Sequence, residues 1–564
     1  MRLAVAATLA ALLFAAGPAQ AAKTLIVNAN GYTLDAGGNL RRFGTLFIGD
    51  DGKVLATLPR GSAEPKLAAG DFKLDAKGRT LIPGLIDAHG HVMGLAVGLR
   101  QLDLTSATSL ADAQARISAH AAQQTTARWI RGRGWNQVVW NLGRFPTAAD
   151  LDSAHADRPV WLERVDAHAG WANSAAMKAA GITRATKDPK GGRILRDAAG
   201  NPTGVFIDSA MALIERAAPP PSAGEREKGL EAALQHLASL GLTGVHDMGT
   251  SPQDWALFRA FGDDGRLTVR ITSYAAGMDA MEAISPLRPT PWLYGDRLAL
   301  RGIKIFTDGA LGSRGAWMLQ PYSDEPGTRG LGFLDDTKQK NLFSRANFLG
   351  YQVAVHAIGD AANRQALDSF AEIRPTYGDG FRNRIEHAQV IAPVDIPRFA
   401  DLRIIASVQP THATSDKAMA EDRIGPARLD GAYAWVALTN AGARLALGSD
   451  FPVEPANPFW GLHAAVTRQD RADQPPGGWR PQEALSLLQA FAGFTTDAAY
   501  AGGMETRVGS LQEGRWADFL LLDRDPFAIA PSELKETKVE ETWLAGKRVF
   551  VKKTNQETSA TSSD

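Results

Sequence analysis

The stretch Leu81-Ile-Pro-Gly-Leu-Ile-Asp-Ala-His-Gly-His91 is an apolar run that ends in two histidines one residue apart. Alternate side chains of a strand share a face, so His89 and His91 are expected to point the same way, with Gly90 leaving space between them. Two neutral imidazoles on one face can bind a single cation. Two histidines at a strand end can also be ordinary polar residues, so the rest of the chain has to decide.

Apolar or β-branched runs recur after residue 241, separated by helical patterns such as 252–261 and 361–373. This alternation predicts parallel βα units. With the run at 81–91 there are eight strands, which predicts an α/β fold of the TIM type, a (β/α)8 barrel with its reactive groups at the carboxyl ends of the strands. The later predicted strands are 242–246, 267–272, 300–306, 351–356, 384–387, 404–408 and 443–450.

The chain is predicted to have three structured parts. The barrel takes residues 81–504, and its first crossover is far longer than a helix requires, so an α+β subdomain is expected at 100–215, roofing the strand ends. Strand-like runs with Gly- and Asp-rich turns near both ends predict a composite β-sandwich domain from 22–80 and 505–552. The polar tail, 553–564, is predicted to be disordered.

The first 21 residues have the pattern of a cleavable secretory signal. Arg2 precedes an apolar segment at 3–16, followed by Gly17-Pro18 and the small-residue sequence Ala19-Gln-Ala21, where cleavage is expected. The apolar segment is shorter than the roughly 20 residues that a spanning helix needs. Since no twin arginine is present, the expectation is general secretion of a soluble, periplasmic protein with no membrane span.

Composition excludes several classes of function. The chain has no cysteine, which rules out disulfides, thiolate metal ligands and a cysteine nucleophile. Its 61 basic and 61 acidic residues balance, and no long basic block is present, so nucleic acid is not an expected partner. The expected partner is a small-molecule substrate, and the sequence carries no mark of an oligomeric state.

Polar residues stand at equivalent places in other predicted strands. Lys304 interrupts its strand, while His356, His387 and Asp450 end theirs. A lone histidine at a strand end is usually a hydrogen-bonded structural residue. A set of histidines and an aspartate at equivalent strand ends instead indicates a metal site of a barrel enzyme.

Several segments resemble the amidohydrolase superfamily and, within it, the amidohydrolase-3 family, which includes the N-substituted formamide deformylases. The resemblance extends over nearly all of the mature chain and includes a C-terminal segment similar to the one with which these enzymes return to their β-domain. The segments are 82–91 (IPGLIDAHGH), 303–314 (IKIFTDGALGSR), 356–360 (HAIGD), 385–389 (IEHAQ), 448–453 (GSDFPV) and 508–523.

The resemblance implies a ligand set. His89 and His91 would bind the more buried metal and His356 and His387 the second, while Asp450 would bind metal and carry protons. The site would hold one or two divalent metals; zinc suits these ligands, but manganese, nickel, iron and cobalt do as well.

Lys304 would occupy the place of the ligand that bridges two metals. An ammonium group cannot bridge cations, but burial favours the neutral amine, which can react with carbon dioxide to form a carbamate. The alternative is that Lys304 only pairs with Asp308 or Asp450, in which case one metal is expected.

These parts predict a metal-dependent hydrolase of carbon–nitrogen bonds in non-peptide amides, formamides or N-acyl compounds. A cation lowers the pKa of bound water from 15.7 to about 7, so hydroxide is available, and Asp450 can act as base and then acid. No G-x-S-x-G, H-E-x-x-H or P-loop motif offers another chemistry. The alternatives are hydrolysis of esters, lactones or cyclic amides at the same site, or a non-catalytic periplasmic protein that binds metal or ligand.

Substrate contacts are harder to predict because they lie in loops and in the insert. Candidates are Trp135, His168, Arg314 and Gln409, although each of these residue types often has a structural role. Several of the 13 tryptophans lie between 129 and 171, which predicts a partly aromatic cavity under the insert.

Overall fold

The computed structural model describes residues 22–553, except for 126, 138, 165–168, 190–191 and 313. The predicted signal segment and the tail beyond 553 lie outside this part of the chain. Within the described residues, no helix is long and apolar enough to cross a membrane.

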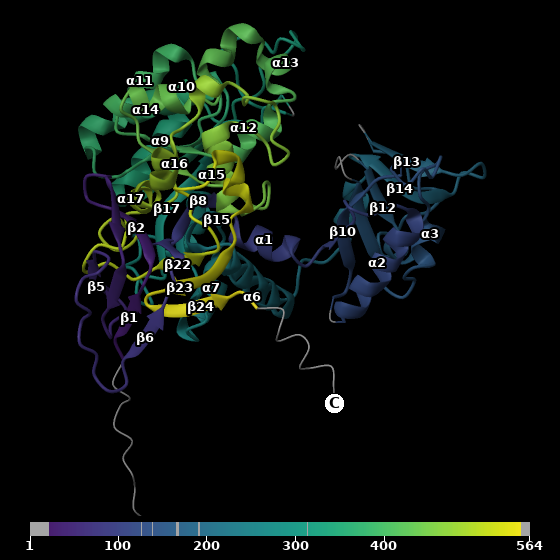
Figure 1. Ribbon diagram of the computed structural model, residues 1–564. Coiled ribbons are helices and arrows are strands. Elements are labelled where there is room, and N and C mark those ends of the chain that lie inside the picture. The colour runs from purple at the N-terminus through teal and green to yellow at the C-terminus, as the bar shows by residue number, and fades with distance from the viewer. Residues whose placement is uncertain are drawn as a thin grey trace, which may run out of the picture.

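Eight parallel strands confirm the predicted barrel (Figure 1). The first and last strands are joined beyond their ends, where Asp450 N donates to His89 O at 2.7 Å and His91 N donates to Phe451 O at 2.8 Å. The strands are continuous buried runs, as expected for a parallel sheet covered on both faces. In sheet order they are β8 (Leu85–Gly90), β15 (Leu242–Thr250), β16 (Arg270–Ala276), β17 (Leu298–Phe306), β18 (Gln352–Ala357), β19 (Arg384–His387), β20 (Ile405–Val408) and β21 (Leu445–Leu447).

The opening apolar run is divided between two sheets, not given wholly to the barrel. Its first part, β7 (Thr80–Pro83), pairs with strands of the terminal domain, and only β8 enters the barrel. The division falls at Gly84, where an added Cβ would lie 2.2 Å from Thr243 Oγ1. The close approach of Thr243 therefore requires glycine where the chain passes from one sheet to the other.

Helices cover the outside of the barrel between its strands. α7 shows how the sequence sets them: Ser251 caps the helix by accepting from Asp254 N, and Pro252 occupies its first turn. The covering helices are α6 (Ala223–Ser239), α7 (Pro252–Asp263), α8 (Gly277–Ile284), α9 (Asp336–Phe348), α10 (Asp360–Tyr377), α11 (Ile396–Asp401), α14 (Trp435–Asn440), α15 (Pro458–Thr467), α16 (Leu487–Gly493) and α17 (Thr496–Ala501).

Strands from both ends of the chain lie side by side in a two-sheet domain, purple and yellow in Figure 1. Ile26, Leu46, Leu81, Phe519 and Trp543 belong to one buried cluster that includes residues of both sheets. One sheet contains β5 (Val54–Leu58), β4 (Thr45–Ile48), β1 (Thr24–Val27) and β6 (Phe72–Asp75). The other contains β24 (Lys547–Val551), β23 (Val539–Leu544), β22 (Phe519–Leu522), β7, β2 (Asn30–Leu34) and β3 (Leu40–Phe43).

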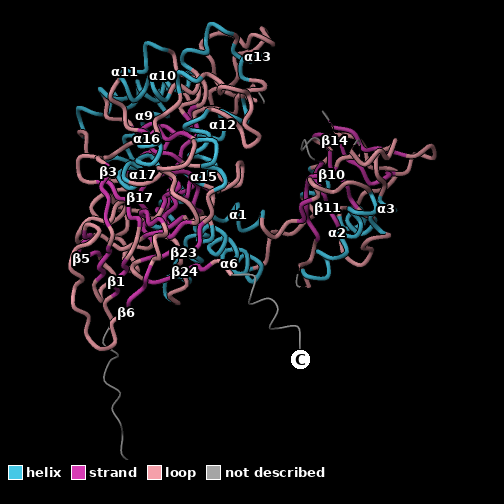
Figure 2. Tube along the Cα trace, viewed as in Figure 1, coloured by secondary structure: helices cyan, strands magenta, loops and turns pink. Residues whose placement is uncertain are grey.

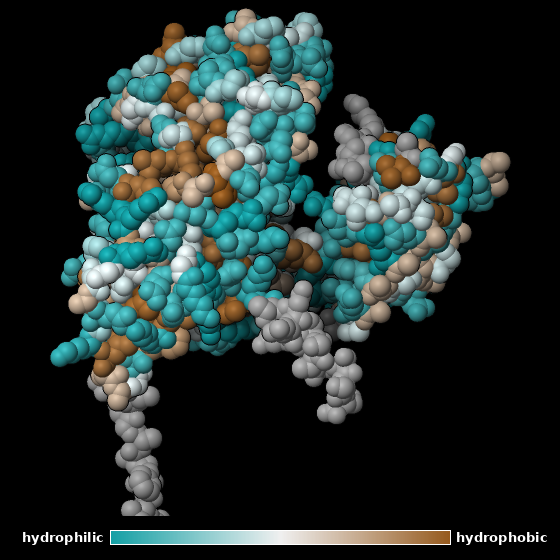
Figure 3. Space-filling view, viewed as in Figure 1, coloured by the Kyte–Doolittle hydropathy of each residue, from teal (hydrophilic) through white to brown (hydrophobic). Residues whose placement is uncertain are grey.

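The inserted segment forms a separate subdomain with its own six-stranded sheet, which stands beside the barrel next to α1 (Val92–Gly98) and α6 (Figure 2). The space-filling view shows a hollow between the two bodies (Figure 3). Its strands are β9 (Leu102–Asp103), β10 (Ile130–Trp135), β11 (Val160–Arg164), β12 (Ala169–Ala172), β13 (Gly192–Arg196) and β14 (Pro202–Asp208), and its helices include α2 (Leu110–Gln123), α3 (Ala148–Asp152) and α4 (Ser174–Ala179).

Candidate active site

His89 and His91 leave the end of β8 toward the barrel axis. His89 is fully buried, and its Nδ1 lies 2.6 Å from Glu386 Oε2. A proton shared with this carboxylate places the Nε2 lone pair toward the cavity, where it can bind a cation. His91 Nε2 lies 3.0 Å from Asp450 Oδ1, so both imidazoles converge on one carboxylate.

Lys304, on β17, is buried beside them, and its Nζ lies 3.3 Å from His89 Nε2. Burial lowers the pKa of this lysine from 10.5 to about 8. Among the described residues, no carboxylate oxygen forms an ion pair with Nζ within 4.0 Å. Asp308 instead accepts the backbone N–H groups of Trp317, Ile358 and Gly359.

His387 is the last residue of β19 and His356 the penultimate residue of β18, and their ring centroids lie 4.6 Å apart. Burial lowers the pKa of His356 to about 3 and that of His387 well below its ordinary value, so both are neutral and able to act as ligands at pH 7. His387 Nδ1 lies 2.9 Å from Gln409 Oε1, which directs its Nε2 away from Gln409. His356 Nε2 lies 3.4 Å from Asp308 Oδ1.

Asp450 follows β21 and links the histidines. Burial alone would raise its pKa, but the imidazoles of His89, His91 and His412 hold the pKa below its ordinary value. Although His91 Nε2 lies 3.0 Å away, Asp450 Oδ1 accepts no hydrogen bond of regular geometry from the described residues. Asp450 and His387 have φ values of 62° and 74°, a left-handed conformation that is rare outside glycine and recurs at functional sites.

Two side chains of this site were missed in the sequence. His412, on α12 (Pro410–Asp416), stacks on His387 with centroids 5.8 Å apart, and its Nε2 lies 3.7 Å from Asp450 Oδ2. This buried Nε2 has no hydrogen-bond partner in the described chain. A signal for His412 exists in the sequence: the predicted strand 404–408 has no candidate metal ligand at its end, and His412 follows it by four residues. Glu386 lies inside the motif 385–389, where the sequence pattern alone indicates only a strand residue.

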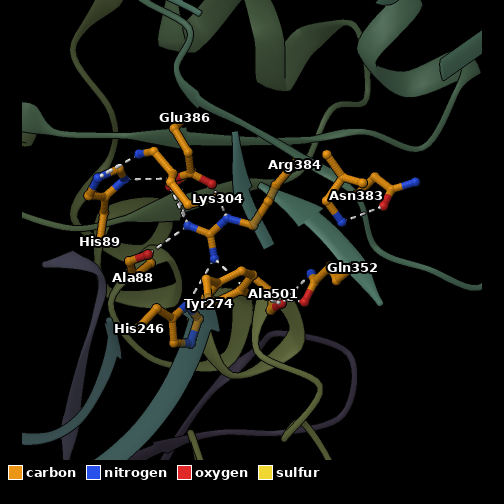
Figure 4. Close-up of polar contacts among 12 residues, drawn as sticks. Ala88, His89, His246, Tyr274, Lys304, Gln352, Asn383, Arg384, Glu386 and Ala501 are labelled. Carbon is orange, nitrogen blue, oxygen red and sulfur yellow. Dashed lines mark hydrogen bonds and ion pairs between the residues drawn. The ribbon is translucent and has the colours of Figure 1, made fainter. Parts of the chain in front are cut away.

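Glu386 is held by Arg384, whose guanidinium is the centre of a buried network (Figure 4). Burial disfavours the Glu386 carboxylate, but the charge of Arg384 and the contact with His89 hold its pKa well below the ordinary value. Arg384 also lies 2.8 Å from His246 Nδ1 through one Nη, while its other Nη donates to Ala88 O at 2.6 Å. The candidate metal ligand His89 is therefore oriented by an ionised carboxylate.

These side chains fit a cation. Two sets of three side chains share Asp450, and within each set the ligand atoms lie within 4.8 Å of one another. His89 and His91 complete one set, and His387 and His412 complete the other. Imidazole nitrogens with a carboxylate, and no sulfur, suit zinc and other divalent transition metals. The buried, unpartnered atoms of Asp450 and His412 are the polar groups that a cation would satisfy.

Sequence comparison agrees with this geometry, because a family model described as the amidohydrolase family matches residues 74–550. The chain belongs to the amidohydrolase family. The putative amidohydrolase YtcJ of Bacillus subtilis (strain 168) is 35% identical over 492 residues, which are 85% of this chain and 90% of that protein. The N-substituted formamide deformylase of Arthrobacter pascens is 29% identical over 554 residues, 93% of this chain and 97% of that enzyme.

A solved structure shares the fold of this amidohydrolase. The uncharacterized metal-dependent hydrolase from Pyrococcus horikoshii OT3 superposes with a TM-score of 0.75 and 28% identity, covering 90% of this chain and 99% of that one. Together with the site, these comparisons establish a metal-dependent hydrolase and confirm the resemblance seen in the sequence.

The amidohydrolase has a cavity of about 800 Å³ above these side chains. Its floor contains the six predicted metal-site residues and His412, and its walls add apolar and acidic side chains. Phe306 is 49% exposed and Val453 is 70% exposed at its mouth. The wall residues include Phe306, Leu311, Ile358, Gln389, Asp416, Val453 and Glu454.

The candidate substrate contacts lie elsewhere. Trp135 is fully buried among Trp140 and Trp171 in the core of the inserted subdomain, and its Nε1 donates to Leu162 O. Arg314 is paired with Asp324 outside the cavity, and Gln409 supports His387 from behind. His168 lies outside the described residues.

The expected roof is likewise not seen in the described residues of the insert, none of which lines this cavity. The tryptophans of the insert pack against one another in its own core, because a subdomain of this size needs its own apolar centre to fold.

Proposed function

We propose that this amidohydrolase hydrolyses the carbon–nitrogen bond of a non-peptide amide, formamide or N-acyl compound. The observation that carries the proposal is the convergence of two histidine groups on Asp450 beneath an open cavity. A relative that matches over 97% of its length is named as an N-substituted formamide deformylase, which supports this substrate class.

The residues that would hold the metal are His89, His91 and Asp450, with His387 and either His356 or His412 available for a second cation. A bound divalent cation lowers the pKa of water and polarises a carbonyl group. Asp450 accepts a proton from the attacking water through a carboxylate oxygen and returns it to the leaving nitrogen. The water oxygen bonds to the carbonyl carbon and the C–N bond breaks, so the products are an acid and an amine.

Lys304 is proposed to carry a carbamate. The neutral amine attacks carbon dioxide, a new N–C bond forms and one proton leaves, which gives a carboxylate-like group with two oxygens. Its complete burial and the 3.3 Å distance from His89 Nε2 support this assignment, and the lowered pKa makes the neutral amine accessible. The metal is proposed to be zinc. The enzyme is proposed to be secreted to the periplasm, on the strength of its first 21 residues.

The test is a substrate panel with the mature chain loaded with zinc and bicarbonate. N-alkyl and N-aryl formamides and N-acyl amines are expected to be cleaved faster than dipeptides or the matched esters. Asp450→Asn should lower kcat by about 10²- to 10⁴-fold with unchanged thermal stability, as expected for loss of the acid–base group. Glu454→Gln at the cavity rim is the matched control. Preferential cleavage of esters or dipeptides would contradict the proposed substrate class.

A further inference from the structure

A second cavity lies at the junction between the inserted subdomain and the barrel. It is bounded by α1 and α6 of the barrel and by the segment around β10 of the insert, and it shares no lining residue with the active-site cavity. The two cavities are therefore lined by different residues, and the chemistry of the second has to be considered separately.

Arginines dominate the charged groups of this cavity. Arg226 is neutralised by Asp254, with Nη2 2.5 Å from Oδ1. Arg100, Arg128 and Arg131 also line the cavity, and among the described residues none of the three has a carboxylate oxygen within 4.0 Å. The side-chain hydrogen bonds of Arg100 and Arg131 go to neutral acceptors: Arg100 donates to Gln124, and Arg131 donates to Pro219 O.

The acidic lining residue is already engaged. Glu225 accepts from the backbone N–H and the hydroxyl of Ser222 and so caps the start of α6. The lining therefore carries three further guanidinium groups, of which Arg131 is partly balanced by the charge of Glu163 on β11. Guanidinium groups pair with carboxylates, sulfonates and phosphates through several hydrogen bonds at once, and a concave wall of low polarity strengthens that attraction.

The remaining lining is apolar. Met93 is buried and Val97 half-buried on α1, while Trp129 and the run Pro219–Pro221 contribute flat, apolar surfaces. A few convergent charged groups in a mainly apolar concave site are typical of a small-molecule site. We propose that this junction cavity binds a small organic anion, whose acidic group is held by Arg100, Arg128 and Arg131 and whose apolar body packs on Val97 and the prolines.

A ligand in this cavity would contact both the inserted subdomain and the barrel, since Arg128 and Arg131 belong to the insert and Val97 to the barrel. Binding would therefore favour one placement of the insert over others, because a ligand shifts an equilibrium toward the state that it binds better. The site is independent of the hydrolytic reaction proposed above.

The probe is 8-anilinonaphthalene-1-sulfonate, a fluorescent aromatic anion, titrated into the intact mature protein with its metal bound. N-phenyl-1-naphthylamine, which has the same rings without the sulfonate, is the neutral comparison. One saturable site is expected for the anion. The double variant Arg128→Gln/Arg131→Gln should raise its Kd by about tenfold or more, in line with the loss of charge-assisted hydrogen bonds, and leave the Kd of the neutral dye unchanged.

Arg184→Gln/Arg193→Gln is the matched control, because both arginines are exposed on the same subdomain and line neither cavity. Val97→Trp, which fills the apolar part, should weaken binding of both dyes. An unchanged Kd for the anion in Arg128→Gln/Arg131→Gln, or an equal change in the control pair, would overturn the proposal. An equal rise in the Kd of the neutral dye for Arg128→Gln/Arg131→Gln, at unchanged thermal stability, would also overturn the proposal, because the site would then not select for charge.

Discussion

Arg384 and Glu386 stand two residues apart on β19 and form a fully buried ion pair, with Nε 2.5 Å from Oε1. Side chains at this spacing share a face of the strand, so both enter the barrel interior. The second oxygen of Glu386 lies 2.6 Å from His89 Nδ1. A charge pair deep in the barrel thus fixes the tautomer and orientation of a histidine that faces the cavity.

Glu386→Gln should lower both stability and metal affinity. The change leaves Arg384 buried without its counter-charge, which typically costs about 3–5 kcal/mol in the free energy of unfolding. Loss of the group that orients a ligating histidine should weaken metal binding by about 10- to 100-fold. Denaturant unfolding and metal titration measure the two effects.

The control is Arg384→Met/Glu386→Leu, which removes both charges. It should recover much of the stability, since apolar replacements of a buried pair are often neutral, but not the metal affinity. Recovery of metal affinity in the double variant would show that Glu386 does not orient His89.

Lys304→Met should reduce the metal content from about two to about one per chain if the lysine carries the bridging carbamate. Methionine keeps most of the volume but cannot react with carbon dioxide. Elemental analysis gives the metal count, and added propionate should partly restore the second metal by supplying a carboxylate. Lys340→Met, which removes a lysine paired with Glu372 at the surface, should leave the count unchanged. Equal metal content in both variants would contradict the carbamate.

The barrel could be predicted because most of its strands are short apolar or β-branched runs and helical patterns lie between them. β18 is an example: Gln352 to Val355 are buried, and the half-buried His356 follows just before the strand ends at Ala357. The division of the first run at Gly84 could not be predicted, since both halves are equally apolar and the choice of sheet depends on contacts with Thr243 and β22.

Strand ends indicated the predicted site, but two kinds of residue escaped this reasoning. His412 lies in a helix after β20, so its approach to Asp450 depends on how that segment folds back. Glu386 reads as a strand residue, and its contact with His89 joins β19 to β8 across the barrel. Trp135 was a candidate substrate contact but lies in the core of the insert, because an aromatic residue near a family motif fills a core as readily as a pocket.

Trp135→Ala should destabilise the inserted subdomain by about 3–5 kcal/mol, as for other buried aromatic residues, and leave KM unchanged. Thermal unfolding and steady-state kinetics separate these effects. Phe306→Ala is the contrasting variant, since Phe306 lies at the cavity mouth and should change KM with little effect on stability. A raised KM in Trp135→Ala at temperatures where the variant is folded would place Trp135 near the substrate after all.

Asp87 gives the protein a pH-dependent stability. It is fully buried and accepts from Ser449 N at 3.0 Å, Ser449 Oγ at 2.6 Å and His89 N at 3.0 Å. Burial raises its pKa from 3.8 to about 7. Between these values the folded chain binds a proton that the unfolded chain has released, so the contribution of Asp87 to stability falls as pH rises, by at most about 4 kcal/mol.

Asp87→Asn should remove this pH dependence, because the amide keeps an acceptor for the backbone donors and cannot ionise. In metal-free protein, the stability of the variant relative to wild type should therefore be higher at pH 7.5 than at pH 5, as measured by denaturant midpoints. Asp71→Asn is expected to show the same difference from wild type at pH 5 and pH 7.5. Backbone N–H groups of Ala68 and Lys23 hold the pKa of that exposed carboxyl below its ordinary value, so Asp71 is ionised in the folded and the unfolded chain at both pH values. The same difference from wild type at both pH values in Asp87→Asn would mean that Asp87 is already ionised in the folded protein at pH 5.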